Sequence, residues 1–415
     1  MKHILFFMLM AATFGQTATA QEANPDTIYR QFALDEVVVT GTRTPKFLKD
    51  TPIQTRVINA KDIARQDATN VQDLLQQELP GVEFSYAMNQ QTHLNFSGFG
   101  GQGVLFLVDG ERLAGETMDD VDFTRLNMDN VERIEIVKGA ASALYGSNAT
   151  GGVINIITKK TDKPWTLNVN GRLARHNEQR YGASFGLNGK RLCNMFTANY
   201  TDVDNFDVHS AADPVTRIIS TVYGDRTLNL KDQLVWSPSR NVEIGGRVGY
   251  FFRQTTRTAE QPERYRDFSG GLRIDWTLSD HDMLQANYAF DQYDKSGYQK
   301  LRKLDIRDYS NVRNMFRLLY NHTFGSGDIL TAGADFMHDY LFNTNLDNTE
   351  RKQDSFDFFM QYDWRISQKL EAVGAVRYDY FSDGGESRLT PKLNLCYKPV
   401  RNLSLRAGYG MGFRA

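Results

Sequence analysis

The larger, C-terminal part of the sequence alternates between apolar and polar residues in one run after another. In Leu370–Tyr380, for example, Leu370 and Val376 fall on one face of an extended chain, and Glu371 and Arg377 fall on the other. Such alternation is typical of β-strands whose two faces meet different surroundings. Several runs are about 9–12 residues long, which exceeds most strands of soluble proteins and matches a tilted strand that crosses a bilayer.

The connections between these runs also alternate in length. Short turns lie at 188–190, 237–241, 279–282, 325–328, 367–369 and 399–402. Longer, polar and charged segments lie at 201–225, 253–265, 292–310 and 341–353. Short turns on one side and long loops on the other are typical of an outer-membrane β-barrel, whose strands need only one apolar face. No run of about 18 apolar residues follows the first 20 residues, so helical membrane spans are not expected.

The strand count predicts an incomplete barrel. We expect about 13 strands in residues 165–415, whereas bacterial single-chain barrels have an even number of strands. The sequence ends at Gly412–Ala415, inside an expected element. An open barrel would leave unpaired backbone groups in lipid, at several kcal/mol each. We therefore expect a chain that is truncated within the barrel.

The N-terminus has the pattern of a secretory signal peptide over residues 1–20. Lys2 provides a positive charge, Ile4–Ala12 an apolar segment, and Ala18–Ala20 a cleavage site of small residues. An uncleaved membrane anchor is the alternative. Residues 21–44 are polar and aperiodic, which predicts a flexible leader.

Residues 45–161 have a different, more compact pattern. Helix-like spacing of apolar residues in 62–79 predicts one helix that ends at Pro80-Gly81. The run Val104–Val108 predicts a buried strand. Residues 131–160 predict two further strands, rich in β-branched residues, around a turn of small residues.

This block resembles the plug domain of TonB-dependent outer-membrane receptors of the siderophore, haem or cobalamin type. The resemblance rests on Leu79–Val82, on Leu107–Gly110 and above all on residues 131–160. It implies an N-terminal α+β plug domain (45–161), followed by an antiparallel transmembrane β-barrel (165–415) with about 13 of roughly 22 strands. It also implies a place in the bacterial outer membrane.

A short segment ahead of this block resembles the TonB box of the same family. It consists of Asp35, Glu36, Val37, Val38, Val39, Thr40 and Gly41. A Val-rich segment on a flexible leader can pair with the edge of a partner's sheet, where main-chain hydrogen bonds supply the affinity. The resemblance implies that the partner is TonB, the inner-membrane energy-coupling protein. The alternative is an ordinary edge strand of the plug.

The resemblance also implies contacts between the plug and the barrel wall. The residues expected to make them are Glu132, Arg133, Glu135 and Lys138. Such ion pairs would hold the plug in place and still let it yield to a pull. The alternative is that these residues are solvated charges on a strand.

Two segments expected at the outward tip of the plug, 86–92 and 114–120, are the predicted sites of cargo binding. The candidate residues are Tyr86, Asn89, Gln90, His93, Glu116 and Asp119. A neutral imidazole at His93 could ligate haem iron, although a single histidine beside a strand is more often structural.

A predicted outer loop carries three closely spaced carboxylates, Asp202, Asp204 and Asp207. Hard oxygen ligands at this spacing could bind Ca²⁺, and some cobalamin receptors of this family order an equivalent loop with calcium. The pattern of an EF-hand loop is absent, because Phe206 occupies a ligand position. A solvated acidic loop is the alternative, and no cofactor is required.

Together these features predict energised uptake of a scarce, bulky nutrient, namely an iron chelate (siderophore or haem) or cobalamin. Outer-membrane lipid is an expected partner, and a surface lipoprotein is a further candidate. The formal net charge of −2 gives no reason to expect nucleic acid. No Ser–His–Asp, Cys–His or paired-carboxylate arrangement indicates an enzyme. The alternative is a surface protein that binds without transport, or a truncated receptor without function.

Overall fold

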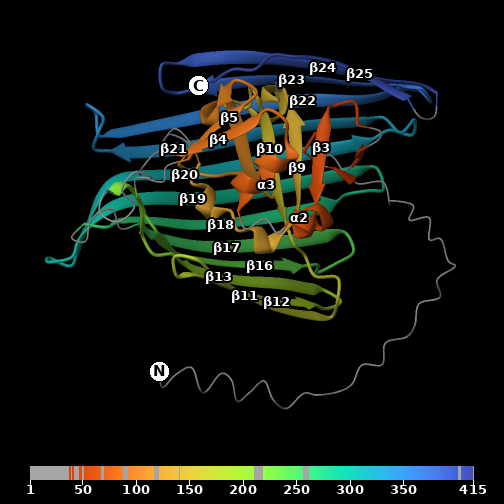
Figure 1. Cartoon of the computed structure of the whole chain (residues 1–415). Coiled ribbons are helices and arrows are strands. Elements are labelled where there is room, and N and C mark those ends of the chain that lie inside the picture. The colour runs from red at the N-terminus through yellow and green to blue at the C-terminus, as the bar shows by residue number, and fades with distance from the viewer. Residues whose placement is uncertain are drawn as a thin grey trace, which may run out of the picture. The chain divides into compact units, whose positions relative to one another are not determined.

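A computed structural model describes most of the chain (Figure 1). The described residues are 37–38, 40–41, 46–48, 51–66, 70–86, 92–115, 121–139, 141–209, 218–255, 261–400 and 403–414. They belong to one compact unit, Val37–Ala415. The predicted signal peptide and most of the predicted leader lie outside the described residues. No described helix is long and apolar enough to cross a membrane.

The predicted plug is built on a five-stranded sheet in the order β3-β9-β10-β7-β8. The strands are β3 (Thr55–Asn59), β7 (Val104–Val108), β8 (Glu111–Arg112), β9 (Val131–Lys138) and β10 (Gly152–Thr158). β7 and β10 run parallel, and the other neighbours are antiparallel. All five residues of β7 are buried, as its apolar sequence predicts.

Helices and short strands complete the plug. The single helix predicted over 62–79 is in fact two, α2 (Ala60–Gln66) and α3 (Val71–Glu78). They are separate because Asn70 caps α3, where its side chain accepts a hydrogen bond from the Asp73 amide at 2.7 Å. The remaining elements are β1 (Val37–Val38), β2 (Lys46–Phe47), β4 (Val82–Tyr86), β5 (Thr92–Phe96), β6 (Phe99–Gly100), α4 (Ser142–Tyr145) and the 3-10 turns η2 (Gly101–Gly103), η3 (Phe123–Arg125) and η4 (Met128–Asn130).

Most of the remaining described chain forms one antiparallel sheet of 13 strands, which confirms the predicted strand number. In spatial order they are β11 (Trp165–Ala174), β12 (Glu178–Asn188), β13 (Leu192–Asp202), β16 (Asp225–Trp236), β17 (Val242–Thr255), β18 (Glu263–Thr277), β19 (Asp282–Gln299), β20 (Leu304–Thr323), β21 (Ile329–Asn343), β22 (Glu350–Ser367), β23 (Leu370–Phe381), β24 (Glu386–Val400) and β25 (Leu403–Gly410). β11 and β25 are the two edges of this sheet, which is not closed.

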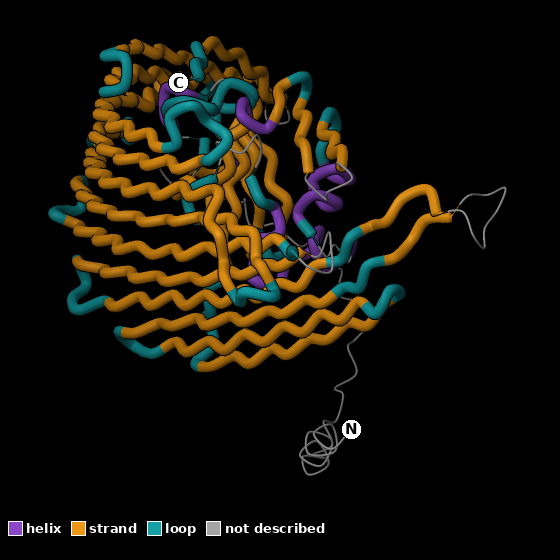
Figure 2. The backbone as a smooth tube through the Cα atoms, turned by 90° about the vertical axis from the view of Figure 1, so that its left-hand side faces the viewer, coloured by secondary structure: helices purple, strands orange, loops and turns teal. Residues whose placement is uncertain are grey.

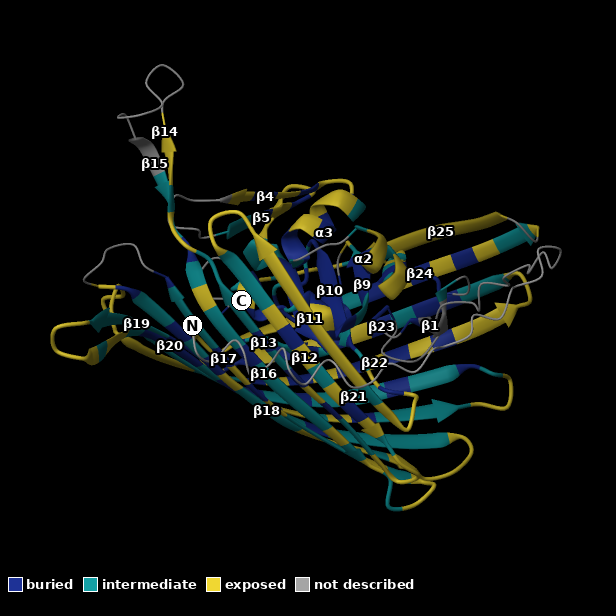
Figure 3. Cartoon of the chain, turned by 60° about the horizontal axis from the view of Figure 1, so that its bottom comes forward, coloured by how far each residue is buried: buried dark blue, intermediate teal, exposed yellow. Residues whose placement is uncertain are grey.

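The two faces of the large sheet differ, and the sheet curves around the plug elements (Figure 2). On β22, Phe356 and Phe358 are exposed, whereas Ser355 and Asp357 are buried. Buried and exposed residues alternate in the same way along β24 (Figure 3). An apolar outer face and a polar inner face are the arrangement of a transmembrane barrel.

A separate hairpin lies between β13 and β16 along the chain, while β13 and β16 themselves are paired neighbours in the large sheet. It consists of β14 (Phe206–His209) and β15 (Ile218–Val222), and it projects away from the sheet (Figures 2 and 3). The imidazole of His176 stacks on the ring of Phe206, with centroids 3.8 Å apart, at the base of the hairpin. The segment 201–225, which the sequence predicts to be a loop, is therefore partly folded.

Candidate functional site

The described part of the predicted TonB box is bound to the plug through Thr40. The amide and the hydroxyl of Thr40 both donate hydrogen bonds to Oε2 of Glu135, at 2.8 and 2.7 Å. Glu135 lies on β9 and is fully buried. Asn155 on β10 donates to the Thr40 hydroxyl at 2.9 Å, and the Tyr145 hydroxyl on α4 donates to the Thr40 carbonyl at 2.9 Å. Three elements of the plug therefore bind this one residue.

The rest of the predicted box is only partly described. Val37 and Val38 pair with Phe47 and Lys46 as the two-stranded sheet β1–β2, and Val38 is fully buried. Asp35, Glu36 and Val39 lie outside the described residues. A docked TonB box and an edge strand of the plug would both have this arrangement, so the TonB-binding role stays a prediction.

The Thr40→Val variant tests this attachment. Valine keeps the branched shape but removes the hydroxyl, so Glu135 and Asn155 each lose one hydrogen bond. Unpaired buried polar groups cost about 1–3 kcal/mol each, so we expect the box to detach more often. A cysteine placed at Val37, in a background without the two native cysteines, should react with a thiol reagent at least about tenfold faster. Thr55→Val is the matched control, and equal rates in all three proteins would contradict the attachment.

The four residues predicted to meet the barrel wall find partners within the plug. Arg133 donates to Glu132 at 2.7 Å and to Glu135 at 2.9 Å. The ammonium group of Lys138 lies 5.7 Å from the ring centroid of Phe96. These charges lie on β9, between β3 and β10, whereas Phe96 lies on β5 of the separate sheet β4-β5-β6, so two sheets of the plug supply the partners. A role of these four residues against the barrel stays a prediction, while other residues join the plug to the large sheet.

Arg125, in η3, makes the first of these contacts. Its guanidinium forms ion pairs with Asp267 on β18 at 2.7 Å and with Asp291 on β19 at 2.9 Å. Burial alone would lower the pKa of Arg125, but the two carboxylates hold it above its ordinary value. The amide of Ala114 also donates to Asp291 at 2.7 Å. A cation and an amide of the plug thus share one carboxylate of the sheet.

Asp122 provides an ion pair of the opposite polarity beside Arg125. Arg253 on β17 lies 3.0 Å from the Asp122 carboxylate, and the Tyr293 hydroxyl on β19 donates to it at 2.6 Å. Burial would raise the pKa of Asp122, but the charge of Arg253 and the hydrogen bonds from Thr124 and Tyr293 outweigh it, so the pKa lies below its ordinary value. The irregular segment 121–125 is therefore bound as a charged unit to β17, β18 and β19.

The loop 113–115 adds backbone contacts at the same place. Arg313 on β20 donates to the Leu113 carbonyl at 2.8 Å, and the Gly115 amide donates to Asn311 on β20 at 2.7 Å. Gly115 has φ +91°, and a Cβ there would lie 3.0 Å from the ring of Tyr293. Glycine is needed because the loop backbone packs directly on that ring.

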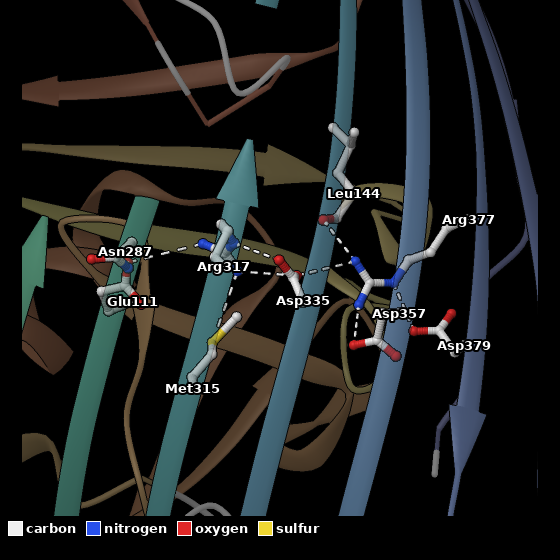
Figure 4. A network of polar contacts seen from close by, with 9 residues as sticks. All are labelled: Glu111, Leu144, Asn287, Met315, Arg317, Asp335, Asp357, Arg377 and Asp379. Carbon is white, nitrogen blue, oxygen red and sulfur yellow. Dashed lines mark hydrogen bonds and ion pairs between the residues drawn. The ribbon is translucent and has the colours of Figure 1, made fainter. Parts of the chain in front are cut away.

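A second buried cluster is centred on Arg377 of β23 (Figure 4). Its guanidinium pairs with Asp379 at 2.6 Å and with Asp357 on β22 at 2.7 Å. Asp335 on β21 lies between two arginines, 3.4 Å from Arg377 and 2.9 Å from Arg317 on β20. One network of ion pairs thus crosses four neighbouring strands on the inner face of the sheet.

The plug meets this network at two points. Arg377 donates to the Leu144 carbonyl of α4 at 3.5 Å. The backbone of Gly146, with φ +79°, lies so close that a Cβ there would be 3.0 Å from Nη2 of Arg377. At the second point Glu111 on β8 lies 3.9 Å from Arg317, and it also accepts a hydrogen bond from Asn287 on β19. The small residues of the turn within 131–160 therefore leave the space in which the Arg377 side chain packs against the plug.

Sequence reasoning did not single out Arg125, Asp122 or their partners. A signal was present for Asp335, which lies between Ala334 and Phe336, but it was weaker for Asp267 and Asp291, which each have one apolar and one polar neighbour. In a barrel whose outer face is apolar, such positions point inward, where a plug must neutralise them.

Most of the predicted cargo-binding residues lie outside the described part of the chain. Asn89, Gln90, Glu116 and Asp119 are not described, and of Tyr86 only the backbone at the end of β4 is described. His93 lies on β5 opposite Ser85 of β4, and it is half-buried. Cargo binding by these six residues stays a prediction.

The three predicted calcium ligands bind separate neighbours. Asp202 pairs with Arg226 at 2.9 Å. Asp204 accepts a hydrogen bond from Asn177 at 3.1 Å, and Asp207 accepts one from Thr221 at 2.6 Å. Within the described ranges, no group of three or more His, Cys, Asp or Glu residues is placed to hold a metal ion. Calcium binding by these carboxylates stays a prediction.

Family comparison assigns the two parts of this architecture. The TonB-dependent receptor plug domain matches residues 48–153, and the TonB-dependent receptor-like β-barrel matches residues 289–415. Together these matches span more than half of the chain. The chain belongs to the TonB-dependent receptors, a family of outer-membrane transport receptors of Gram-negative bacteria. The predicted family, fold class and location are thereby confirmed.

Individual relatives and solved structures agree with this assignment. The chain is 24% identical over 406 residues to the vitamin B12 transporter BtuB of Vibrio vulnificus, covering 92% of this chain and 63% of the relative. It is 24% identical over 449 residues to the ferric enterobactin receptor of Pseudomonas aeruginosa, covering 86% and 58%. A crystal structure of a mutant of the P. aeruginosa ferric enterobactin receptor PfeA shares the fold, with a TM-score of 0.73 at 18% identity, covering 87% of this chain and 62% of that one. The chain thus spans about three-fifths of the length of these proteins.

Proposed function

We propose that this protein acts in TonB-dependent uptake across the outer membrane, with an iron chelate or cobalamin as its cargo. The proposal rests on the family assignment, and the attachment of Thr40 to Glu135, Asn155 and Tyr145 is the structural observation that supports it. A pull on the segment that resembles the TonB box would act directly on β9, β10 and α4. The class of cargo is supported by the vitamin B12 transporter and the ferric enterobactin receptor among the relatives.

The contacts of the plug indicate an order of events under such a pull. TonB would add a strand to Asp35–Gly41, and the hydrogen bonds of Thr40 would break first. Because Tyr145 donates to Thr40 and its neighbour Leu144 accepts from Arg377, the pull would then act on α4 against the Arg377 cluster. The segment around Arg125 would stay on β17–β19 longer. Cargo would then pass along the inner face of the sheet near Arg377, where α4 packs before the pull.

An iron chelate is our first choice of cargo. Arg253, Tyr265, Lys295 and Tyr309 are successive register partners on β17–β20, near the connection between β17 and β18. Arg253 reaches Asp122 of the plug, so this row lies on the inner face of the sheet. Arg253 pairs with Asp122 and Lys295 with Glu263, so the aromatic rings of this row and the ferric enterobactin receptor among the relatives support this choice.

The test is accumulation of labelled cargo by cells that express the protein, in strains with and without TonB. We expect accumulation of a labelled iron chelate only where TonB is present. Binding without accumulation in either strain would favour the alternative, a surface protein that binds without transport. Accumulation of labelled cobalamin alone would correct the choice of cargo but leave the uptake mechanism in place.

A further inference from the structure

A cavity of about 310 Å³ lies between the plug and strands β24 and β25. On the plug side it is lined by Pro52–Gln54 and by Lys138 at the end of β9. On the sheet side it is lined by Lys392 and Asn394 of β24 and by Arg406 of β25. Three cationic side chains therefore line the cavity, and its described lining contains no carboxylate.

Lys392 and Asn394 are the buried polar groups of this cavity. Lys392 is 6% exposed, and its ammonium group has no hydrogen-bond partner among the described residues. Asn394 is 8% exposed, and its side-chain NH₂ also has no partner in the described part of the chain. Unpaired buried donors cost free energy, and an unpaired buried charge costs more. Two buried donors of the lining therefore have no acceptor among the described residues.

The local sequence keeps the cavity open on its sheet side. Lys392 and Asn394 are register partners of Gly410 and Gly408 on β25. A Cβ at Gly408 would clash with Oδ1 of Asn394, so the glycine leaves room for that side chain. Arg406 donates from Nε to the Thr51 carbonyl at 2.9 Å, which ties the plug to the same wall.

We propose that this cavity binds a small oxyanion, such as a phosphate ion or a carboxylate-bearing anion. An oxyanion supplies the acceptors that Lys392 and Asn394 lack, and it neutralises part of the charge of Lys138. The cavity volume corresponds to about ten water molecules at roughly 30 Å³ each, which leaves room for a phosphate ion and some of its hydration water. The site is a property of the folded protein, so it stands independently of the proposed uptake.

The test is calorimetric titration of the purified protein with inorganic phosphate and, separately, with citrate. Lys392→Met removes the buried charge and keeps the length of the side chain. Lys398→Met is the matched control on the same strand, because Lys398 lies 3.7 Å from Glu371. We expect saturable binding of at least one anion to the wild type and to Lys398→Met. Binding to Lys392→Met should be at least about tenfold weaker, the effect expected from losing a hydrogen bond to a charged group.

Thermal unfolding provides a second readout that does not depend on heats of binding. A ligand that binds the folded state raises Tm, so the same concentration of anion should raise the Tm of the wild type and of Lys398→Met more than that of Lys392→Met. Without the anion, Lys392→Met should be at least as stable as the wild type, because it no longer buries an unpaired charge. No saturable binding of either anion by the wild type, or equal binding by Lys392→Met, would overturn the proposal.

Discussion

Replacing Arg125 with methionine is expected to lower the free energy of unfolding by about 3–5 kcal/mol, the usual cost of removing one partner from a buried ion pair. The change leaves Asp267 and Asp291 without the guanidinium that lies 2.7 and 2.9 Å away. Their side chains are only 8% exposed, so water cannot take its place. The effect should appear as an earlier unfolding midpoint and as faster amide hydrogen exchange at Ala114 and Gly115.

Two variants make this measurement specific. Arg65→Met is the matched control within the plug, because Arg65 is 72% exposed and its pair with Asp62 lies on the surface. Surface pairs contribute about 0–1 kcal/mol. Arg125→Lys should have an intermediate stability, since lysine keeps the charge but cannot bind two carboxylates with a planar fork. If Arg125→Met were as stable as Arg65→Met, the ion pairs of Arg125 would not hold the plug in place.

Replacing Arg377 with methionine should cost at least as much, about 3–5 kcal/mol or more. Three carboxylates, those of Asp335, Asp357 and Asp379, would lose the same partner. The plug would also lose the hydrogen bond from Arg377 to the Leu144 carbonyl. We therefore expect a lower midpoint of thermal unfolding together with faster proteolysis of the segment 141–150, which contains α4.

Arg388→Met is the control for this second prediction. Arg388 lies on the adjacent strand β24, its side chain is 51% exposed, and it pairs with an exposed Glu386. Adding Asp379→Asn to Arg377→Met should recover part of the lost stability, because one buried charge is then removed. If the double variant were less stable than Arg377→Met, repulsion among the carboxylates would not be the cause of the loss.

The large sheet could be predicted from the sequence because its signal is local. The alternation in Leu370–Tyr380 predicts opposite faces for Val376 and Arg377, and the structure has Val376 exposed and Arg377 buried. The apolar run Val104–Val108 predicts a buried strand without reference to its neighbours. In such elements each side chain's direction follows from its position along its own strand.

The contacts between the plug and the sheet could not be predicted in the same way. Arg125 lies in an irregular segment without periodicity, and its partner Asp267 follows 142 residues later in the sequence. Which carboxylate it meets depends on the register of several strands and on the placement of the plug. Glu135 is a similar case, because its buried carboxylate accepts hydrogen bonds from Thr40, which lies 95 residues earlier in the sequence.

Deletion of Asp35–Gly41 tests most directly the central claim that a pull on this segment drives uptake. The wild type and the deletion variant would be compared for binding and for accumulation of the same labelled iron chelate, in cells that contain TonB. The variant should bind the chelate as the wild type does, because the clusters around Arg125 and Arg377 do not include the deleted residues. Its accumulation should fall to the level of cells without TonB. Accumulation equal to that of the wild type would contradict this account.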